Sequence, residues 1–404
     1  MQTSLSDALK DTPDGREADA ILRSCVHCGF CTATCPTYQL LGDELDSPRG
    51  RIYLIKQVLE GGPVTEKTQL HLDRCLTCRS CETTCPSGVR YGRLVDIGRA
   101  MVEEKVPRTF VARVQRGVLR ALIPYPRRFA ALLRIGRWLR PLLPAALRSK
   151  LPAIQAAAPW PVARHARKML VLDGCVQPAA APNTNAAAAR VLDKLGVSLI
   201  RAQGDGCCGA LSHHLSAHDE ALHFMRRNID AWWPHIEAGA EAIVMTASGC
   251  GVVVKDYGVL LRDDPVYAAK AARISALTQD FSEILAGEKL ESLNVNGGGR
   301  KVAFHAPCTL QHGQQINGVV ETLLRRCGYQ LTAVTNGHLC CGSAGTYSIL
   351  QPELSQQLLA DKLAALQAGA PDIIVTANIG CQLHLQSGAA AQVRHWVELL
   401  DGGR

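Results

Sequence analysis

The sequence predicts a multidomain protein in which an α-helical, cysteine-rich domain is followed by two similar α/β domains. Three observations support this fold class. Eight of the seventeen cysteines form two matching runs within the first segment, and the other nine are spread over a C-terminal region that repeats itself. The connecting stretch contains no cysteine and no acidic residue. We therefore expect four segments, with boundaries at 1–104, 105–168, 169–285 and 300–404.

Length and composition favour several buried cores and a reducing compartment. With 404 residues and a hydrophobic share of 47%, two or three domains are expected. The N-terminus, MQTSLSDALKDTPDGREADA, has no apolar signal core, and no stretch approaches the roughly 20 apolar residues of a membrane span. We expect a cytoplasmic protein that can still contact a membrane surface. In that compartment, seventeen cysteines indicate metal or cluster ligation rather than disulfides.

The N-terminal cysteine runs carry the most specific signal in the chain. Residues 25–36 read CVHCGFCTATCP and residues 75–86 read CLTCRSCETTCP. Both follow C-x2-C-x2-C-x3-C-P, the run of proteins with two [4Fe-4S] clusters, in which the fourth cysteine ligates the other cluster. One predicted ligand set is therefore Cys25, Cys28, Cys31 and Cys85. The second set is Cys75, Cys78, Cys81 and Cys35.

Zinc is the alternative occupant of these runs, because CxxC pairs also bind zinc. A zinc ion needs only four ligands and gives no reason for the third cysteine or for the Cys-Pro ending, so clusters are favoured. His27, inside the first run, is expected to be a surface residue rather than a ligand.

The segment between the two runs predicts a helical type of ferredoxin domain. Ile52, Ile55 and Leu59 recur at helical spacing, and Gly61 follows as a stop. Arg49 and Arg51 precede this apolar face. They either steady a negatively charged cluster or serve as ordinary helix-start charges, and both readings stay open.

The connector 105–168 holds 15 Lys and Arg residues, so the rest of the chain is net acidic. Val111, Val114 and Val118 fall on one helical face, and Arg113, Arg116 and Arg120 fall on the opposite one. A second apolar pattern contains Leu132, Ile135 and Trp138, and Pro141 ends it. A basic amphipathic stretch can lie on an anionic membrane surface or face a partner. The alternative is that these helices are scaffold packed on the next domain. Nucleic-acid binding is not expected, because no recognised motif supports it.

The C-terminal region is an internal repeat. The first half runs from MLVLDGC through CCG to IVMTASGC, and the second runs from VAFHAPC through CCG to IIVTANIGC. The matching order and spacing indicate duplication, and the short β-branched runs predict buried parallel strands. The cysteines follow the predicted strand ends, where α/β folds place their sites.

Each half offers four sulfurs to one candidate metal site. The first set is Cys175, Cys207, Cys208 and Cys250, and the second is Cys308, Cys340, Cys341 and Cys381. Either zinc or a further cluster would fit them, and buried reduced thiols are the alternative. Cys327 lies outside the repeated pattern and is expected to be a core residue.

Together these motifs resemble the heterodisulfide-reductase-like iron-sulfur oxidoreductase subunits with cysteine-rich CCG domains. Within them, the chain is most similar to the iron-sulfur subunits of glycolate oxidase, also called glycolate dehydrogenase. The resemblance covers essentially the whole chain. It is carried by CVHCGFCTATCPTYQLLGDELDSPRGRIYLIKQVLEG, RCLTCRSCETTCPSGVRY, RNIDAWWPHIEAGAEAI, HLCCGSAGTY and IVTANIGCQ.

The resemblance implies a role in electron transfer rather than in substrate chemistry. FAD would sit on partner subunits that oxidise glycolate to glyoxylate, and this chain would pass electrons through its clusters to a membrane acceptor, a quinone. The sequence itself has no GxGxxG placed to bind a flavin, so no catalytic residue is expected here.

The chain departs from the family pattern at one point, and alternatives remain. The wider CCG family closes each half with CxxC, whereas Val253 and His384 stand at the closing positions here. His384 either replaces a sulfur ligand or is a hydrogen-bonded or solvated histidine. One alternative function is the equivalent subunit for lactate or glycerol-3-phosphate oxidation. Others are a thiol/disulfide reductase acting at the CCG cysteines, and a docking subunit whose clusters only stabilise the fold.

Overall fold

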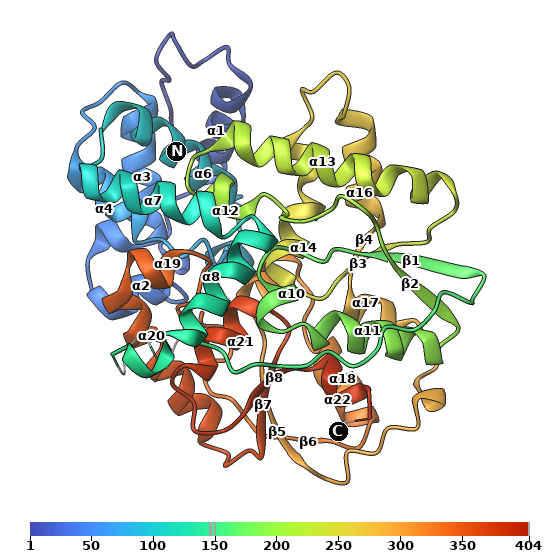
Figure 1. Ribbon diagram of the computed structural model, residues 1–404. Coiled ribbons are helices and arrows are strands. Elements are labelled where there is room, and N and C mark those ends of the chain that lie inside the picture. The colour runs from blue at the N-terminus through green and yellow to red at the C-terminus, as the bar shows by residue number, and fades with distance from the viewer. Residues whose placement is uncertain (145–147, 149–150, 403–404) are drawn as a thin grey trace. The chain divides into compact units, whose positions relative to one another are not determined.

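The computed structural model describes residues 1–144, 148 and 151–402. The chain divides into two compact units. Figure 1 labels their helices and strands. Unit 1 comprises Met1–Arg116 with His338–Leu358, and unit 2 comprises Gly117–Gly337 with Leu359–Arg404.

Unit 1 is helical. Its N-terminal part contains α1 Pro13–Ser24, α2 Pro36–Leu41, α3 Pro48–Leu59, α4 Glu66–Asp73, α5 Ser80–Thr84, α6 Tyr91–Lys105 and the start of α7 Phe110–Leu122. Its C-terminal insert, 338–358, contains α19 Tyr347–Leu350 and the start of α20 Pro352–Gln367. The insert is anchored by the Tyr347 hydroxyl, which donates to the Arg74 carbonyl oxygen at 3.1 Å.

Local sequence explains why α3, which lies between the two cysteine runs, begins where it does. Ser47 caps α3 by accepting from the backbone N–H of Gly50, and Pro48 occupies the first helical position, where no N–H is needed. The predicted apolar face of α3 is buried, with Ile52, Ile55 and Leu59 all at most 3% exposed. They join residues of α1 and α6 in one hydrophobic core, which also includes Cys25, Cys75 and Cys81 of the two cysteine runs.

Unit 2 contains two four-stranded sheets in which every pairing is parallel. The first has the order β2-β1-β3-β4 and the second has the matching order β6-β5-β7-β8. The strands are β1 Arg167–Val171, β2 Val197–Arg201, β3 Ile243–Met245, β4 Thr278–Asp280, β5 Lys301–His305, β6 Gln330–Leu331, β7 Ile373–Thr376 and β8 Val393–His395. The identical order supports duplication of one α/β fold.

The helices of unit 2 fall into three groups along the chain. The connector contributes the end of α7 and α8 Pro126–Trp138. The first half adds α10 Gln177–Ala180, α11 Asn183–Lys194, α12 Ala210–His214, α13 His218–Glu237, α14 Ser248–Lys255, α15 Tyr257–Leu260, α16 Ala268–Leu277 and α17 Phe281–Ala286. The second adds α18 Val319–Arg326, the end of α20, α21 Ile379–Gln386 and α22 Val397–Leu400.

The first sheet is buried on both faces, which explains its continuous apolar strands. Alternate residues of β1 and of the position directly after it enter different cores: Met169 and Val171 join one cluster, whereas Leu170 and Leu172 join another. The second cluster is completed by α13 to α16. The first cluster is shared by both halves, since it contains residues of β1 and α17 as well as of β5, β7 and α22.

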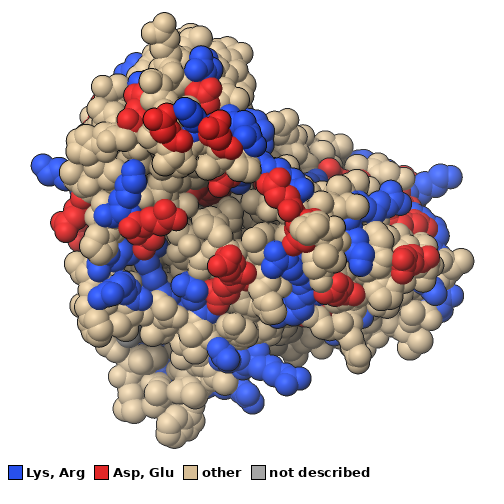
Figure 2. Space-filling view, turned by 90° about the horizontal axis from the view of Figure 1, so that it is seen from above, with Lys and Arg blue, Asp and Glu red and all other residues tan. Residues whose placement is uncertain are grey.

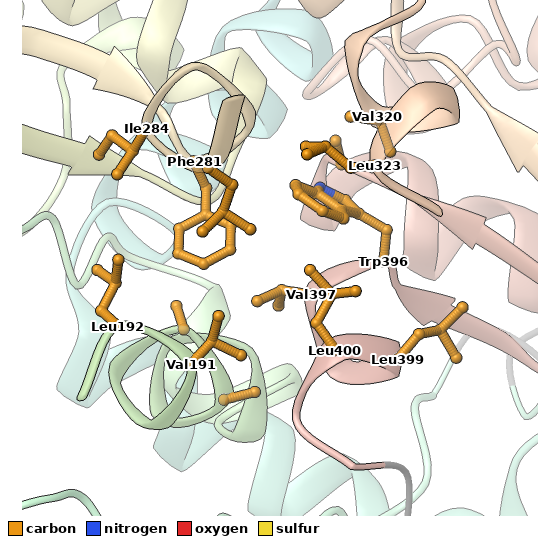
Figure 3. Packing of buried hydrophobic residues seen from close by; sticks show 14 of the residues in the cluster. Val191, Leu192, Phe281, Ile284, Val320, Leu323, Trp396, Val397, Leu399 and Leu400 are labelled. Atoms are coloured by element: carbon orange, nitrogen blue, oxygen red, sulfur yellow. The ribbon is translucent and has the colours of Figure 1, made fainter. Parts of the chain in front are cut away.

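The shared core holds the two α/β halves together. In Figure 3, Phe281 and Ile284 of α17 and Val191 of α11 lie opposite Trp396 and Val397 of the second half. The Phe281 and Trp396 ring centroids are 5.6 Å apart, and both side chains are fully buried. Aromatic pairs at this spacing add attraction beyond their buried area.

The connector helices turn an apolar face outward, which the sequence left undecided. On α7, Val111, Val114 and Val118 are 73%, 47% and 49% exposed. Two arginines of the opposite face make ion pairs with the chain itself: Arg116 with Asp73 at 3.3 Å and Arg120 with Glu220 at 2.7 Å. Charge neutralisation by acidic partners explains why these arginines turn inward.

Candidate iron-sulfur and metal sites

The two cysteine runs of unit 1 repeat the same backbone turns. In each run the second residue after the first cysteine is left-handed, with φ of 59° at His27 and 52° at Thr77. The fourth residue after it is left-handed too, with φ of 87° at Gly29 and 61° at Arg79. L-residues rarely adopt such angles. Their recurrence at matching positions shows that both loops are shaped alike, which points three sulfurs of each run to a common centre.

The structure gathers the eight cysteines around two cavities. The first cavity is lined by Cys25, Cys28, Cys31 and, from the second run, Cys85. The second cavity is lined by Cys75, Cys78, Cys81 and, from the first run, Cys35. Cys81 also borders the first cavity, so the two centres are neighbours. Each cavity therefore combines the four cysteines of one predicted ligand set.

The thiols that line the two cavities have raised pKa values. Burial first, and then the nearby Cys25, Cys85 and Cys28, raise the pKa of the Cys31 thiol to about 11. The pKa of Cys81 is also raised by burial and then by its neighbours Cys78, Cys75 and Cys35, together with Glu82. Four thiolates around one cavity repel each other unless a cation lies among them. A thiolate set of this kind fits an iron-sulfur cluster, whose iron supplies that charge.

In the first α/β half, four cysteines converge at the carboxyl edge of the sheet. Cys175 follows β1, Cys207 and Cys208 follow β2, and Cys250 lies in α14 after β3. Their thiols form a chain of hydrogen bonds that links Cys175 to Cys207, Cys207 to Cys208 and Cys208 to Cys250. The bond to Cys207, and then burial, raise the pKa of Cys175 well above its usual value. The structure thus brings the whole first set together.

The glycine of each CCG motif is required by close packing. Gly209 and Gly342 have φ of 90° and 87°. A Cβ atom at Gly342 would lie 2.6 Å from the Ser355 carbonyl oxygen, and one at Gly209 would lie 2.9 Å from that of Ala221. In both motifs the glycine N–H donates to the sulfur of the first cysteine at 3.4 Å. Each glycine therefore both permits the turn and holds one sulfur in place.

The second set is divided between the compact units. Cys308, after β5, and Cys381, in α21 after β7, belong to unit 2, and both are buried. Cys340 and Cys341 belong to the insert of unit 1 and are buried there as well. Cys327 is buried in the shared core, as expected for a residue outside the repeat.

The sequence reasoning missed His305, at the end of β5. A ring nitrogen of His305 and the sulfur of Cys381 lie within 4.8 Å of each other. Its Nε2 is buried with no hydrogen-bond partner among the described residues. Burial, and then Lys362 and His384, lower the pKa of His305 well below its usual range, so the ring is a neutral donor of the kind that metals bind. Aligning the two halves would have revealed it, because the first half has Leu172 at this position.

Comparisons with known proteins agree with this architecture. The 4Fe-4S dicluster domain family matches residues 21–89, and the cysteine-rich domain family CCG matches residues 169–255 and 302–386. The protein is therefore an iron-sulfur protein with one dicluster domain and a duplicated cysteine-rich domain, which confirms the predicted fold class.

Full-length relatives define the family more narrowly. The chain is 59% identical over 402 residues to the glycolate oxidase iron-sulfur subunit of Escherichia coli (strain K12), covering 99% of this chain and 98% of that protein. It is 30% identical to the "Probable glycolate oxidase iron-sulfur subunit" of Bacillus subtilis (strain 168), covering 91% and 89%. It is 27% identical to lactate utilization protein A of Bacillus licheniformis, over 54% of this chain and 92% of that protein. The chain belongs to the family of glycolate oxidase iron-sulfur subunits, as the sequence motifs indicated.

Proposed function

We propose that this chain is the electron-transfer subunit of a complex that oxidises glycolate to glyoxylate. The observation that carries the proposal is the pair of adjacent four-cysteine cavities in a chain 59% identical to a glycolate oxidase iron-sulfur subunit. When bound, two [4Fe-4S] clusters would relay single electrons from FAD on partner subunits toward a membrane acceptor, a quinone.

The eight cysteines would bind the two clusters, and the exposed rim near Cys28 would exchange electrons. Cys25, Cys28, Cys31 and Cys85 would hold one cluster, and Cys35, Cys75, Cys78 and Cys81 would hold the other. Cys28 is exposed, and its neighbours Val26 and Phe30 are 68% and 62% exposed. This rim is suited to contact a partner that exchanges electrons. No side chain of the two cavities is assigned a role in glycolate chemistry.

Contact with the membrane would use the connector. Among the described residues, no helix is long and apolar enough to cross a bilayer. The outward valines of α7, and Ile135 and Trp138 of α8, which are 55% and 80% exposed, suit insertion at the bilayer interface. Exposed arginines such as Arg127 and Arg134 would meet anionic headgroups. On the face of the molecule shown in Figure 2, basic and acidic side chains are interspersed.

The α/β halves would add metal sites of their own. Cys175, Cys207, Cys208 and Cys250 form the first proposed set, and Cys308, Cys340, Cys341 and Cys381 form the second. The convergence of the first set on one strand edge and the unpartnered Nε2 of His305 beside Cys381 support the proposal. Either zinc or a further cluster would fit sulfur-rich sets of this kind.

One experiment on the complete complex tests the electron-transfer function. Glycolate is added anaerobically, and the cluster EPR signal is followed alongside the iron, sulfide and zinc content per chain. We expect glycolate to reduce the clusters, with lactate and glycerol-3-phosphate as comparison substrates. Iron above about eight per chain, or zinc, would show that the α/β halves are loaded. Intact clusters that glycolate leaves oxidised would contradict the proposal.

A further inference from the structure

The two cysteine cavities of unit 1 differ sharply in their surroundings. At the second cavity, Cys35, Cys75 and Cys81 are buried. At the first cavity, Cys25 is buried but Cys28 is exposed and Cys31 is half-buried. Burial alone would make the second site the harder one to reduce, because each reduction adds a negative charge. The charged and polar neighbours act in the opposite direction.

A fully buried arginine contacts the second cavity. Arg51 is 1% exposed, and its Nη1 lies 4.0 Å from the Cys35 sulfur. The same guanidinium donates to the His71 carbonyl oxygen at 2.7 Å and to Asp46 at 3.1 Å, which fixes its position. Away from water, its charge acts on the cavity with little screening.

The charges around this arginine leave an excess of positive charge. The buried Asp46 carboxylate is shared by Arg51 and Arg74, the latter at 2.8 Å. A third cation, Arg99, donates to the Cys75 carbonyl oxygen at 2.6 Å. Arg79, which borders the cavity, is matched by Glu82 at 2.9 Å. Three cations thus face one carboxylate near the second cavity.

Hydrogen bonds to sulfur add to the effect. The buried hydroxyl of Tyr91 donates to the Cys75 sulfur at 3.6 Å, and the Thr77 backbone N–H donates to the same sulfur at 3.4 Å. The Tyr91 ring borders both cavities, but this hydroxyl contact goes to the second. Donors to ligand sulfurs stabilise the more negative, reduced state.

The first cavity has no comparable charge within the described residues. Its bordering arginine, Arg49, forms an ion pair with Glu44 at 2.7 Å and is one-third exposed. The pair is close to neutral, and water screens it.

We propose that Arg51 and Tyr91 raise the reduction potential of the cluster at Cys35, Cys75, Cys78 and Cys81 above that of its neighbour, so that electrons reside at the buried site. The solvent-facing site at Cys28 would then be the lower-potential point of exchange. This inference rests on the proposed two-cluster function and assigns an order to its centres. It also gives Arg51 a tuning role beyond that of a helix-start charge.

The test is an EPR-monitored potentiometric titration of the full-length chain, with dithionite as the reductant. Wild type should show two one-electron transitions. Tyr91→Phe removes only the hydroxyl. It should make the equilibrium constant for reduction of the higher-potential cluster about tenfold less favourable, which lowers that reduction potential by about 59 mV for a one-electron couple. The lower potential should stay in place.

Two further variants separate the causes. Tyr53→Phe is the matched control, because Tyr53 is 46% exposed and packs near His27 of the first run; it should move neither potential. The variant Arg51→Met removes one buried positive charge and leaves Asp46 paired with Arg74, so it should lower the higher potential further. Should Arg51→Met fail to fold, Tyr91→Phe decides alone.

The outcomes distinguish this inference from the function on which it rests. A Tyr91→Phe chain with full iron content but an unmoved higher potential, or a shift in the lower one, would overturn the potential order. A wild-type chain with only about four irons and one transition would instead overturn the two-cluster proposal itself.

Discussion

Cys78 illustrates how few substitutions a proposed cluster-ligand position would tolerate. It lines the second cavity with Cys35, Cys75 and Cys81, and the pKa of Cys81 is raised by burial first and then by Cys78. A serine there would keep the size of the side chain but remove a soft thiolate ligand, which iron-sulfur clusters require. The loss would also leave three buried sulfurs around a cavity that no longer holds their counter-charge.

We predict that Cys78→Ser abolishes electron flow from glycolate to quinone and lowers the iron content from about eight to about four per chain. Iron analysis and quinone reduction by the complex check this. Cys327→Ala is the matched control, because Cys327 is buried in the α/β core away from the repeated cysteine pattern. Retained flow in Cys78→Ser would remove this residue from the ligand set.

At the scale of elements, α7 shows that a periodic pattern defines two faces but not their surroundings. The valine face and the arginine face were both evident in the sequence. In the structure Arg116 and Arg120 turn toward Asp73 and Glu220, so the apolar face is left outward. We therefore propose that the valines, rather than Arg116 and Arg120, make the membrane contact.

We expect Val114→Asp/Val118→Asp to reduce binding of the full-length chain to anionic vesicles at least tenfold, because each buried valine contributes about 1.5 kcal/mol or more. A flotation assay with phosphatidylserine-containing vesicles measures this. Arg116→Gln/Arg120→Gln should bind nearly as wild type does. If instead the arginine pair loses binding while the aspartate pair keeps it, the contact face is the basic one.

At the scale of the whole molecule, the two α/β halves are joined by one buried histidine as well as by the shared core. The His395 Nε2 atom lies 2.7 Å from the Thr246 carbonyl oxygen of the first half, and Nδ1 accepts from the Val397 N–H at 3.2 Å. One neutral tautomer satisfies both contacts, whereas a protonated ring would set two donors against each other. Burial accordingly lowers the pKa of His395 to about 4.

The low pKa of His395 makes the contact between the two α/β halves sensitive to acid. The folded-state pKa lies below the ordinary value of about 6.5, so the unfolded chain binds the proton first as the pH falls. The contribution of neutral His395 to the free energy of unfolding is complete above pH 6.5. It is lost progressively toward pH 4, by about 2 kcal/mol at pH 5. Urea unfolding followed by tryptophan fluorescence at pH 8 and pH 5 measures it. His395→Gln should show a smaller loss, and an equal loss would exclude His395 as the cause.

Much of the fold and the site was predictable because it depends on local spacing. The two C-x2-C-x2-C-x3-C-P runs indicated two cluster sites, since the turns between their cysteines are short and repeat at His27 and Thr77. The duplication indicated two parallel sheets, because strands that are apolar at consecutive positions must be covered on both faces. The four segment boundaries remain predictions; the structure instead groups 338–358 with the N-terminal helices.

The remaining features depend on contacts between distant residues, which spacing does not encode. From the sequence, Arg51 could have been an ordinary helix-start charge. Only the fold buries it beside Cys35 and Asp46, next to a proposed cluster site. His305 became a candidate ligand because β5 and β7 are neighbours, which brings it close to Cys381. The sequence therefore determined which groups can bind metal and on which faces they lie. Tertiary packing determined which of these groups are buried from solvent and lie next to each other. Electrostatic interactions are therefore strongest at those buried positions.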